Sequence, residues 1–131
     1  MSANTSPIFP LVPVIGAANI SSAVTGLTVS GVTGLTSLLA AGTNGTRVDT
    51  VEVQATGNTT ANMVRLWVYA GSGNAQLFKE VPIPVNTASA SNPAVSVTVP
   101  FATLVLPTGY TLYASTNNAE AYNVLAFGGN Y

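Results

Sequence analysis

The sequence contains no cysteine and no histidine, and its charged side chains are limited to three basic and four acidic residues. Without cysteine there can be no disulfide framework and no zinc thiolate site. Without histidine and cysteine, the Ser-His-Asp and Cys-His arrangements of nucleophilic catalysis are excluded. Charged residues make up 5% of the chain, against about 25% in an average globular protein. The surface must therefore consist mainly of neutral polar side chains.

The scarcity of charge also restricts the partners. Arg47, Arg65 and Lys79 are too few to neutralise a nucleic-acid backbone, so we expect no nucleic-acid partner. No apolar run reaches the ~18 residues of a membrane span, and we expect no membrane association. The N-terminus lacks the basic region of a signal peptide, which predicts a protein made without one. The net charge of −1 favours self-association.

Few titratable groups remain that could carry catalysis or bind a metal. A carboxylate pair of the glycosidase type would have to come from the four acids, Asp49, Glu52, Glu80 and Glu120. Lys79 stands beside Glu80, and we interpret the two as a solvated pair of opposite charges rather than as a catalytic group. The clustered carboxylates of a calcium-binding loop are missing. We therefore expect no enzyme activity, no cofactor and no metal site.

Residues 46–69 carry the clearest pattern, and the rest of the chain is organised around them. In the first half of this stretch, apolar and polar side chains alternate with a period of two, which is typical of a half-buried strand. Val48 is out of phase with Val51, which predicts a β-bulge near Asp49. A turn at residues 57–60 separates this strand from a second one, and together they predict a hairpin.

The second of these strands is apolar on both faces, and this defines the candidate site. One face carries three aliphatic side chains, Val64, Leu66 and Val68. The other face carries residue types that are enriched at protein interfaces, namely Met63, Arg65, Trp67 and Tyr69. Three interpretations remain open for this other face. It is buried within its own domain, it is a subunit or partner interface, or Trp67 and Tyr69 form a carbohydrate-binding platform.

The remainder of the chain is also rich in strand signals. Further strands are predicted at residues 76–83, 95–101, 110–116 and 121–127. The sequence VTGLT occurs at residues 24–28 and 32–36 and favours strand, and residues 35–40 predict a buried strand or one helical turn. About eight strands without a helical period indicate an all-β fold, an antiparallel β-sandwich or jelly roll, with an up-and-down barrel second.

Residues 1–16 are predicted to form an extended N-terminal arm, and residues 17–131 a single β-sandwich domain. Prolines at positions 7, 10 and 13 fix the backbone and remove amide donors, which excludes a helix there. The arm either folds back on its own domain or lies on a neighbouring subunit. Proline lowers the entropy that is lost on ordering. We therefore expect five apolar side chains to dock on a sister copy or a larger shell: Ile8, Phe9, Leu11, Val12 and Val14.

The last features are short turn-and-strand runs in the second two thirds of the chain. They are GTRVD (45–49), ATG (55–57), MVRLWVY (63–69), EVPI (80–83), LPTGY (106–110), ASTNNAE (114–120) and AFGG (126–129). In these runs the chain resembles the small virion structural proteins of tailed bacteriophages and prophages. The resemblance covers about residues 42–131.

This resemblance implies a non-enzymatic structural protein of the capsid decoration (cement) or head-fibre type. Such a protein is made in the host cytoplasm and binds the major capsid protein or another virion protein on the outer surface of the head. Together with the charge-poor surface, it predicts a homo-oligomer, with a trimer favoured and Trp67 and Tyr69 near a contact. The alternative is a tail-fibre or adhesion module that binds a host-surface glycan or protein, through the aromatic face or loops such as residues 86–93.

Overall fold

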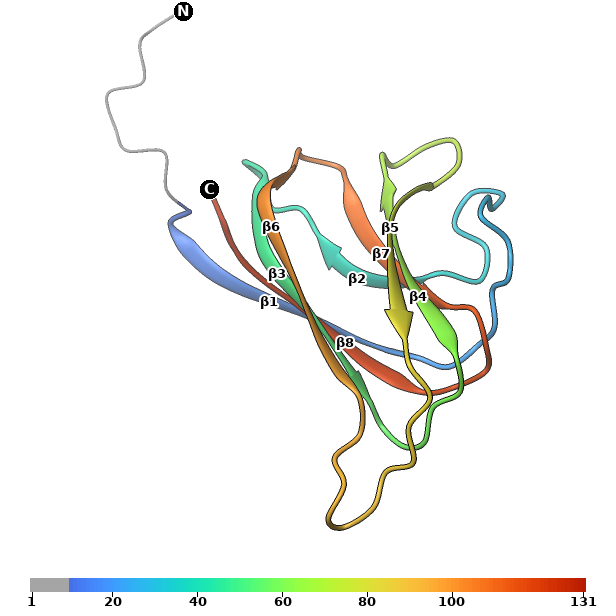
Figure 1. Cartoon of the computed structure of the whole chain (residues 1–131). Coiled ribbons are helices and arrows are strands. Elements are labelled where there is room, and N and C mark those ends of the chain that lie inside the picture. Colours follow the sequence, from blue (N-terminus) through green and yellow to red (C-terminus); the bar gives the residue numbers. More distant parts are fainter. Residues whose placement is uncertain (1–9) are drawn as a thin grey trace, which may run out of the picture.

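Strands make up all the regular secondary structure in residues 10–131, the part of the chain that this computed structural model describes (Figure 1). In chain order they are β1 (Val12–Ile20), β2 (Thr36–Ala40), β3 (Thr46–Ala55), β4 (Asn62–Tyr69), β5 (Gln76–Ile83), β6 (Ser96–Leu106), β7 (Thr111–Thr116) and β8 (Tyr122–Asn130). The bounds of β5 are those expected from the sequence. The strands predicted at residues 95–101 and 121–127 continue for several residues further in β6 and β8.

The strands form two antiparallel four-stranded sheets that pack against each other. The first sheet has the order β1-β8-β3-β6, and the second has the order β2-β7-β4-β5. Alternating apolar side chains from both sheets fill the space between them, and the most buried include Val51, Leu66, Leu112 and Val124, each 0% exposed. The predicted all-β class and antiparallel sandwich are therefore confirmed. They follow from a period of two in the apolar pattern, because alternate side chains of a strand point to opposite faces.

The predicted irregularity in β3 is also confirmed. The register of β3 shifts between Val48 and Thr50 against both of its neighbours, β6 and β8. Against β8 the extra residue is Asp49, whereas against β6 the extra residues belong to residues 101–103 of β6 itself. Val48 and Val51 both reach the core although they are three residues apart. On β8, Gly128 pairs with Val48, and a Cβ on Gly128 would overlap the carbonyl oxygen of Arg47. The bulge thus requires a glycine on the neighbouring strand.

The predicted hairpin of β3 with β4 is wrong. β3 pairs with β6 and β8 in the first sheet, whereas β4 pairs with β5 and β7 in the second. Residues 56–61 therefore cross from one sheet to the other. The turn signal correctly indicated that the chain reverses direction, but a local signal does not specify which strands pair. The hairpin partner of β4 is β5, an edge strand, which is where a proline such as Pro82 is tolerated.

The boundary expected between arm and domain at residue 16 differs from the structure. β1 pairs with β8 from Val12 to Ile20, so residues 12–16 belong to the first sheet. Pro13 is tolerated because β1 is an edge strand. Proline has no amide hydrogen to donate, and along the free edge of a sheet no neighbouring strand needs that donor. Val14 is half-buried and packs against the core. Ile8 and Phe9 lie outside the described residues.

The VTGLT repeat does not form the predicted strands. Residues 24–35 contain no strand residue, and the short strand β2 begins only at Thr36. Gly31 and Gly34 have φ angles of 61° and 79°, which lie in the left-handed region and are incompatible with an extended strand. The segment instead forms a long connection between β1 in the first sheet and β2 in the second.

One consequence of this packing can be tested at Gly16. β1 and β2 belong to different sheets but approach closely at this residue, where a Cβ on Gly16 would overlap the carbonyl oxygen of Leu38 and lie 2.9 Å from the Leu39 Cβ. Gly16→Ala is expected to lower the free energy of unfolding by about 2 kcal/mol or more, because a backbone carbonyl must move to admit the methyl group. Urea denaturation followed by the fluorescence of Trp67, the only tryptophan, measures the change.

Gly57→Ala provides the matched control. A Cβ at Gly57 would meet nothing within 4 Å, and its φ angle is not positive. Its stability should stay within about 0.5 kcal/mol of the original chain. Equal stability of the two variants would contradict the close approach of β1 and β2.

Candidate functional site

The predicted interface residues lie together on the outer face of the second sheet. Val64 and Leu66 point into the core, so Arg65 and Trp67 of the same strand point away from it. Trp67 is nevertheless 0% exposed. Its indole nitrogen Nε1 donates a hydrogen bond of 2.8 Å to the hydroxyl of Ser115 on the neighbouring strand β7. A tryptophan on the outer face of a sheet can be this deeply buried only when another part of the chain covers it.

The cover is the connection between β1 and β2, residues 21–35, which we call the strap. Near its beginning, the amide of Val24 donates to the carbonyl of Thr116 at 2.8 Å. Near its end, the carbonyl of Gly31 accepts a hydrogen bond of 2.8 Å from the amide of Ala75 at the start of β5. The strap is thus attached on both sides of the outer face that carries Trp67. Figure 1 shows it as the blue-to-cyan loop beside the second sheet.

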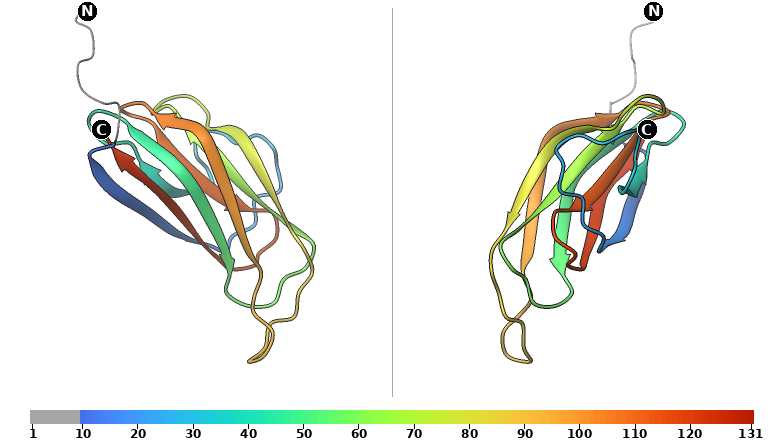
Figure 2. Two further views of the ribbon diagram at one scale, coloured as in Figure 1. Left: turned by 60° about the vertical axis from the view of Figure 1, so that its left-hand side comes forward. Right: turned by 90° about the vertical axis from the view of Figure 1, so that its right-hand side faces the viewer.

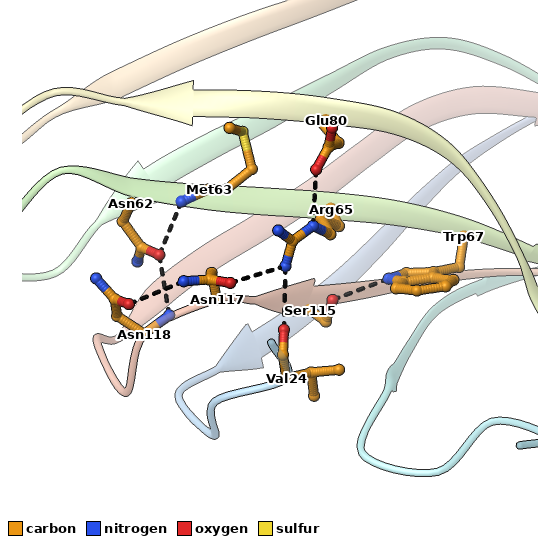
Figure 3. Close-up of polar contacts among 9 residues, drawn as sticks. All are labelled: Val24, Asn62, Met63, Arg65, Trp67, Glu80, Ser115, Asn117 and Asn118. Carbon is orange, nitrogen blue, oxygen red and sulfur yellow. Dashed lines mark hydrogen bonds and ion pairs between the residues drawn. The ribbon is translucent and has the colours of Figure 1, made fainter. Parts of the chain in front are cut away.

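Arg65 joins the strap to the sheet (Figure 3). Its side chain is 8% exposed, and its Nε lies 2.9 Å from the carboxylate of Glu80 on β5. One terminal nitrogen donates both to the carbonyl of Val24 in the strap and to the side-chain oxygen of Asn117, each at 3.1 Å. The guanidinium therefore holds three parts of the chain together. A buried arginine needs such a set of acceptors, because an unpaired buried charge is strongly destabilising.

The structure therefore selects the first of the three interpretations for Trp67, burial within its own domain. Met63 and Tyr69 are half-buried beside it, and the Tyr69 ring packs edge-on against Tyr113 at 5.9 Å between centroids. The expected contact of Trp67 with a partner is not available in this arrangement, and neither is stacking of a sugar on its ring. The sequence did not indicate this cover, because the strand propensity of the VTGLT repeat favoured a strand over an irregular segment on the outer face.

A network of polar side chains closes one end of the sandwich. The Asn62 side chain of β4 donates hydrogen bonds of 2.9 Å to the hydroxyls of Thr116 and Tyr122, which belong to different sheets. The Tyr122 hydroxyl donates in turn to the Glu120 carboxylate at 2.9 Å. Glu120 also accepts a bond of 2.9 Å from the amide of Thr60. These bonds connect the two sheets at this end of the sandwich.

This network shifts two pKa values. Burial acts to raise the pKa of Glu120, but hydrogen bonds from Thr60, Tyr122 and Asn62 outweigh it and hold this pKa below its ordinary value. Burial, reinforced by the adjacent Glu120 carboxylate, raises the pKa of Tyr122 to about 12. The carboxylate thus stays charged and the phenol neutral over the whole physiological range. This is the arrangement of a structural network rather than of a proton-transfer site.

The remaining acids are held by separate partners. Asp49 pairs with Arg47 on the outer side of β3 at 2.7 Å. Glu52 accepts hydrogen bonds from Ser96 and Thr98 of β6, at 2.9 Å and 2.6 Å. Over residues 10–131, no group of three or more potential metal ligands comes together. No helix of that same region is long and apolar enough to cross a membrane.

The outer face of the first sheet carries a feature that sequence reasoning missed. On β1 and β8, outward side chains form an apolar strip that we call the β1–β8 face: Leu11, Pro13, Ile15, Ala17, Leu125 and Phe127. Ile15 is directly opposite Phe127, and Ala17 is opposite Leu125. Leu11 is 79% exposed and Ile15 is 64% exposed. The available signal was that β1 and β8 are both apolar on their two faces.

One of the expected docking residues, Leu11, lies at the beginning of this strip. Val12 is 57% exposed, but it shares the side of β1 that carries Val14 and is not part of the strip. Val14 is not available for docking, because it points toward the core.

No model of a known protein family matches this chain, and no curated protein sequence matches it.

The role of Arg65 can be tested through the fluorescence of Trp67. Arg65→Met removes the bonds to Glu80, Val24 and Asn117, and should lower stability by about 1–3 kcal/mol. The strap should loosen, so the emission of Trp67 should shift to the red and become accessible to a neutral quencher. Arg47→Met is the control, since Arg47 and Asp49 form an exposed pair that contributes little. An unchanged emission spectrum in Arg65→Met would show that the strap covers Trp67 without Arg65.

The Tyr122 network predicts a loss of stability at alkaline pH. The pKa of Tyr122 is about 12 in the folded state and about 10 when unfolded. The unfolded state therefore loses this proton first, and stability is constant below pH 10 and falls between pH 10 and 12. The loss amounts to about 2–3 kcal/mol at most.

Tyr122→Phe isolates this contribution. It should be less stable than the original chain at pH 7 by about 1–2 kcal/mol, because Asn62 and Glu120 each lose a partner. Its alkaline loss should be smaller by the amount above. Tyr69→Phe, which changes a half-buried ring outside the network, serves as the control. Equal alkaline losses in Tyr122→Phe and the original chain would refute the assignment.

Proposed function

We propose that this chain is a non-enzymatic virion structural protein, a capsid decoration (cement) protein that binds the outer surface of a phage head and stabilises it. The strand order, β1-β8-β3-β6 facing β2-β7-β4-β5, supports assigning the sandwich to the jelly-roll class. Viral capsid domains and lectins share this architecture. A fold alone does not decide between such roles, so the surface must carry the choice.

The observation that carries it is the β1–β8 face. Exposed apolar patches of about 300–600 Å² on soluble proteins are frequently functional. The charges nearest to this strip are already satisfied, since Arg47 pairs with Asp49, and Glu52 accepts from Ser96 and Thr98. The strip therefore favours an apolar contact with another protein chain over the recognition of a charged ligand. The major capsid protein, or another virion protein, is the partner that fits this proposal.

The proposal includes self-association and an N-terminal arm. A chain with 5% charged residues and a net charge of −1 has little electrostatic repulsion between copies. We propose a homo-oligomer, with a trimer favoured, displayed on the outside of the particle. The arm is reduced from the expected residues 1–16 to the residues that precede β1, and Ile8 and Phe9 remain its docking side chains.

One observation favours the alternative, a tail-fibre or adhesion module. The polar loop between β5 and β6 extends well beyond the end of the sandwich (Figure 2). It is held by its own hydrogen bonds, including those from the Asn86 side chain to the carbonyl of Pro93 at 3.0 Å and from the Ser89 amide to the carbonyl of Asn92 at 2.8 Å. A projecting polar loop of fixed shape is suited to binding a glycan or protein on a host surface.

Binding to separated virion parts tests the proposal. The tagged chain is mixed with purified heads, with tails and with host envelopes, and each sample is sedimented. On this proposal it binds heads saturably and raises the temperature at which they release DNA, because an added shell of contacts must be broken first. A variant with residues 88–91 replaced by two glycines should bind heads equally well. Binding to envelopes alone, abolished in the loop variant, would instead establish the adhesion module.

A further inference from the structure

The β1–β8 face lacks a cover within residues 10–131. Its most exposed side chains, Leu11, Ile15 and Phe127, are 79%, 64% and 36% exposed. Pro13, Ala17 and Leu125 continue the apolar strip beside them. The strip is narrow and follows β1 lengthwise. An extended segment of chain covers a strip of this shape better than a globular surface does.

The chain itself supplies such a segment, because it enters β1 from the outer side of the first sheet. A Cβ on Gly129 would overlap Pro10, so Pro10 packs on the outer face of β8. The amide of Leu11 donates to the carbonyl of Asn130 at 2.7 Å, which fixes the backbone at this point. The nine residues before Pro10 carry no charged side chain and include Ile8 and Phe9. Fully extended they reach about 30 Å, the length of a nine-residue strand such as β1.

The far end of the β1–β8 face is too distant for the chain's own Ile8 and Phe9, so a segment that binds there must come from a neighbouring copy. A shallow hollow of about 340 Å³ lies there, lined by Ala17, Asn19, Asn123 and Leu125 among others. Ala17 is about 20 Å along β1 from Leu11. Even if the chain reversed at Leu11, its own Ile8 would reach back only about 10 Å. The hollow is therefore beyond the reach of the chain's own apolar pair.

We propose that Ile8 and Phe9 of a second copy of this chain dock on the β1–β8 face, with one of the two side chains in the hollow between Ala17 and Leu125. The contact is head-to-tail, since the segment of one copy meets the face of the next. A head-to-tail contact repeated around a rotation axis closes a ring, which agrees with the favoured trimer. This inference rests on the proposed assembly role, because it names how the copies of the oligomer are joined.

Cross-linking of introduced cysteines tests this contact, since the chain has no cysteine of its own. A full-length Ile8→Cys chain with an affinity tag is mixed with an untagged Ala17→Cys chain and mildly oxidised. Docking raises the local concentration of the two thiols, so the mixed disulfide should form about tenfold more than in the control. The control replaces Ala17→Cys by Leu27→Cys, which is on the strap of the other sheet and 55% exposed. Equal yields with the two partners, or no mixed disulfide, would overturn the proposal.

Two further measurements make the result decisive. Light scattering of the unmodified chain should show an oligomer that Ile15→Asp, but not Leu27→Asp, dissociates, with Trp67 fluorescence confirming that both variants are folded. A chain carrying both Ile8→Cys and Ala17→Cys, oxidised at high dilution, should give no internally bridged monomer. Such a monomer would place the segment on its own face and refute docking between copies. Only the purified protein is used here, so docking between copies can be refuted while binding to heads is still observed. Equally, binding to heads can be refuted while docking between copies is still observed.

Discussion

Both sheets carry apolar side chains on their outer faces as well as their inner ones, and the fold depends on how those outer faces are covered. Packing the two sheets together buries only the inner faces. On the second sheet, the strap lies over the outer face, and Trp67 is inaccessible to solvent. On the first sheet, residues 10–131 provide no equivalent, and Ile15 and Phe127 stay open to solvent. This asymmetry favours the outer face of the first sheet as the surface that contacts other molecules.

Arg65, one of very few charged residues in the chain, adds a side-chain bond to the backbone bonds that hold the strap. An irregular segment contributes little apolar area of its own, and its backbone polar groups need partners. Arg65 supplies one of them by donating to the carbonyl of Val24, while Glu80 balances its charge. Of the three basic side chains in the sequence, one is therefore committed to internal structure. The remaining surface is nearly neutral, which is consistent with contacts that rely on shape and apolar area.

Local features of the sandwich could be predicted from the sequence, and long-range ones could not. The alternation in β3 and β6, the bulge at Asp49 and the edge position of β5 all follow from periodicity and proline chemistry, which act over a few residues. The pairing of β3 and β4 with other strands depends on how both pack across the core. The burial of Trp67 depends on residues 21–35, which are distant in sequence and have no period. The partial exposure of Phe127 likewise depends on its register opposite Ile15.

The polar network around Tyr122 has a mechanical consequence. The Asn62 side chain of the second sheet is bonded to Tyr122 of the first, and Gly16 of β1 lies against the backbone of Leu38 on β2. The first contact is a directional hydrogen bond and the second is a close steric fit, whereas the aliphatic contacts between the sheets are not directional. The sheets are therefore hindered from sliding past each other. A pulling force that enters through β1 is shared between both layers, so the edge strand resists being peeled away by itself.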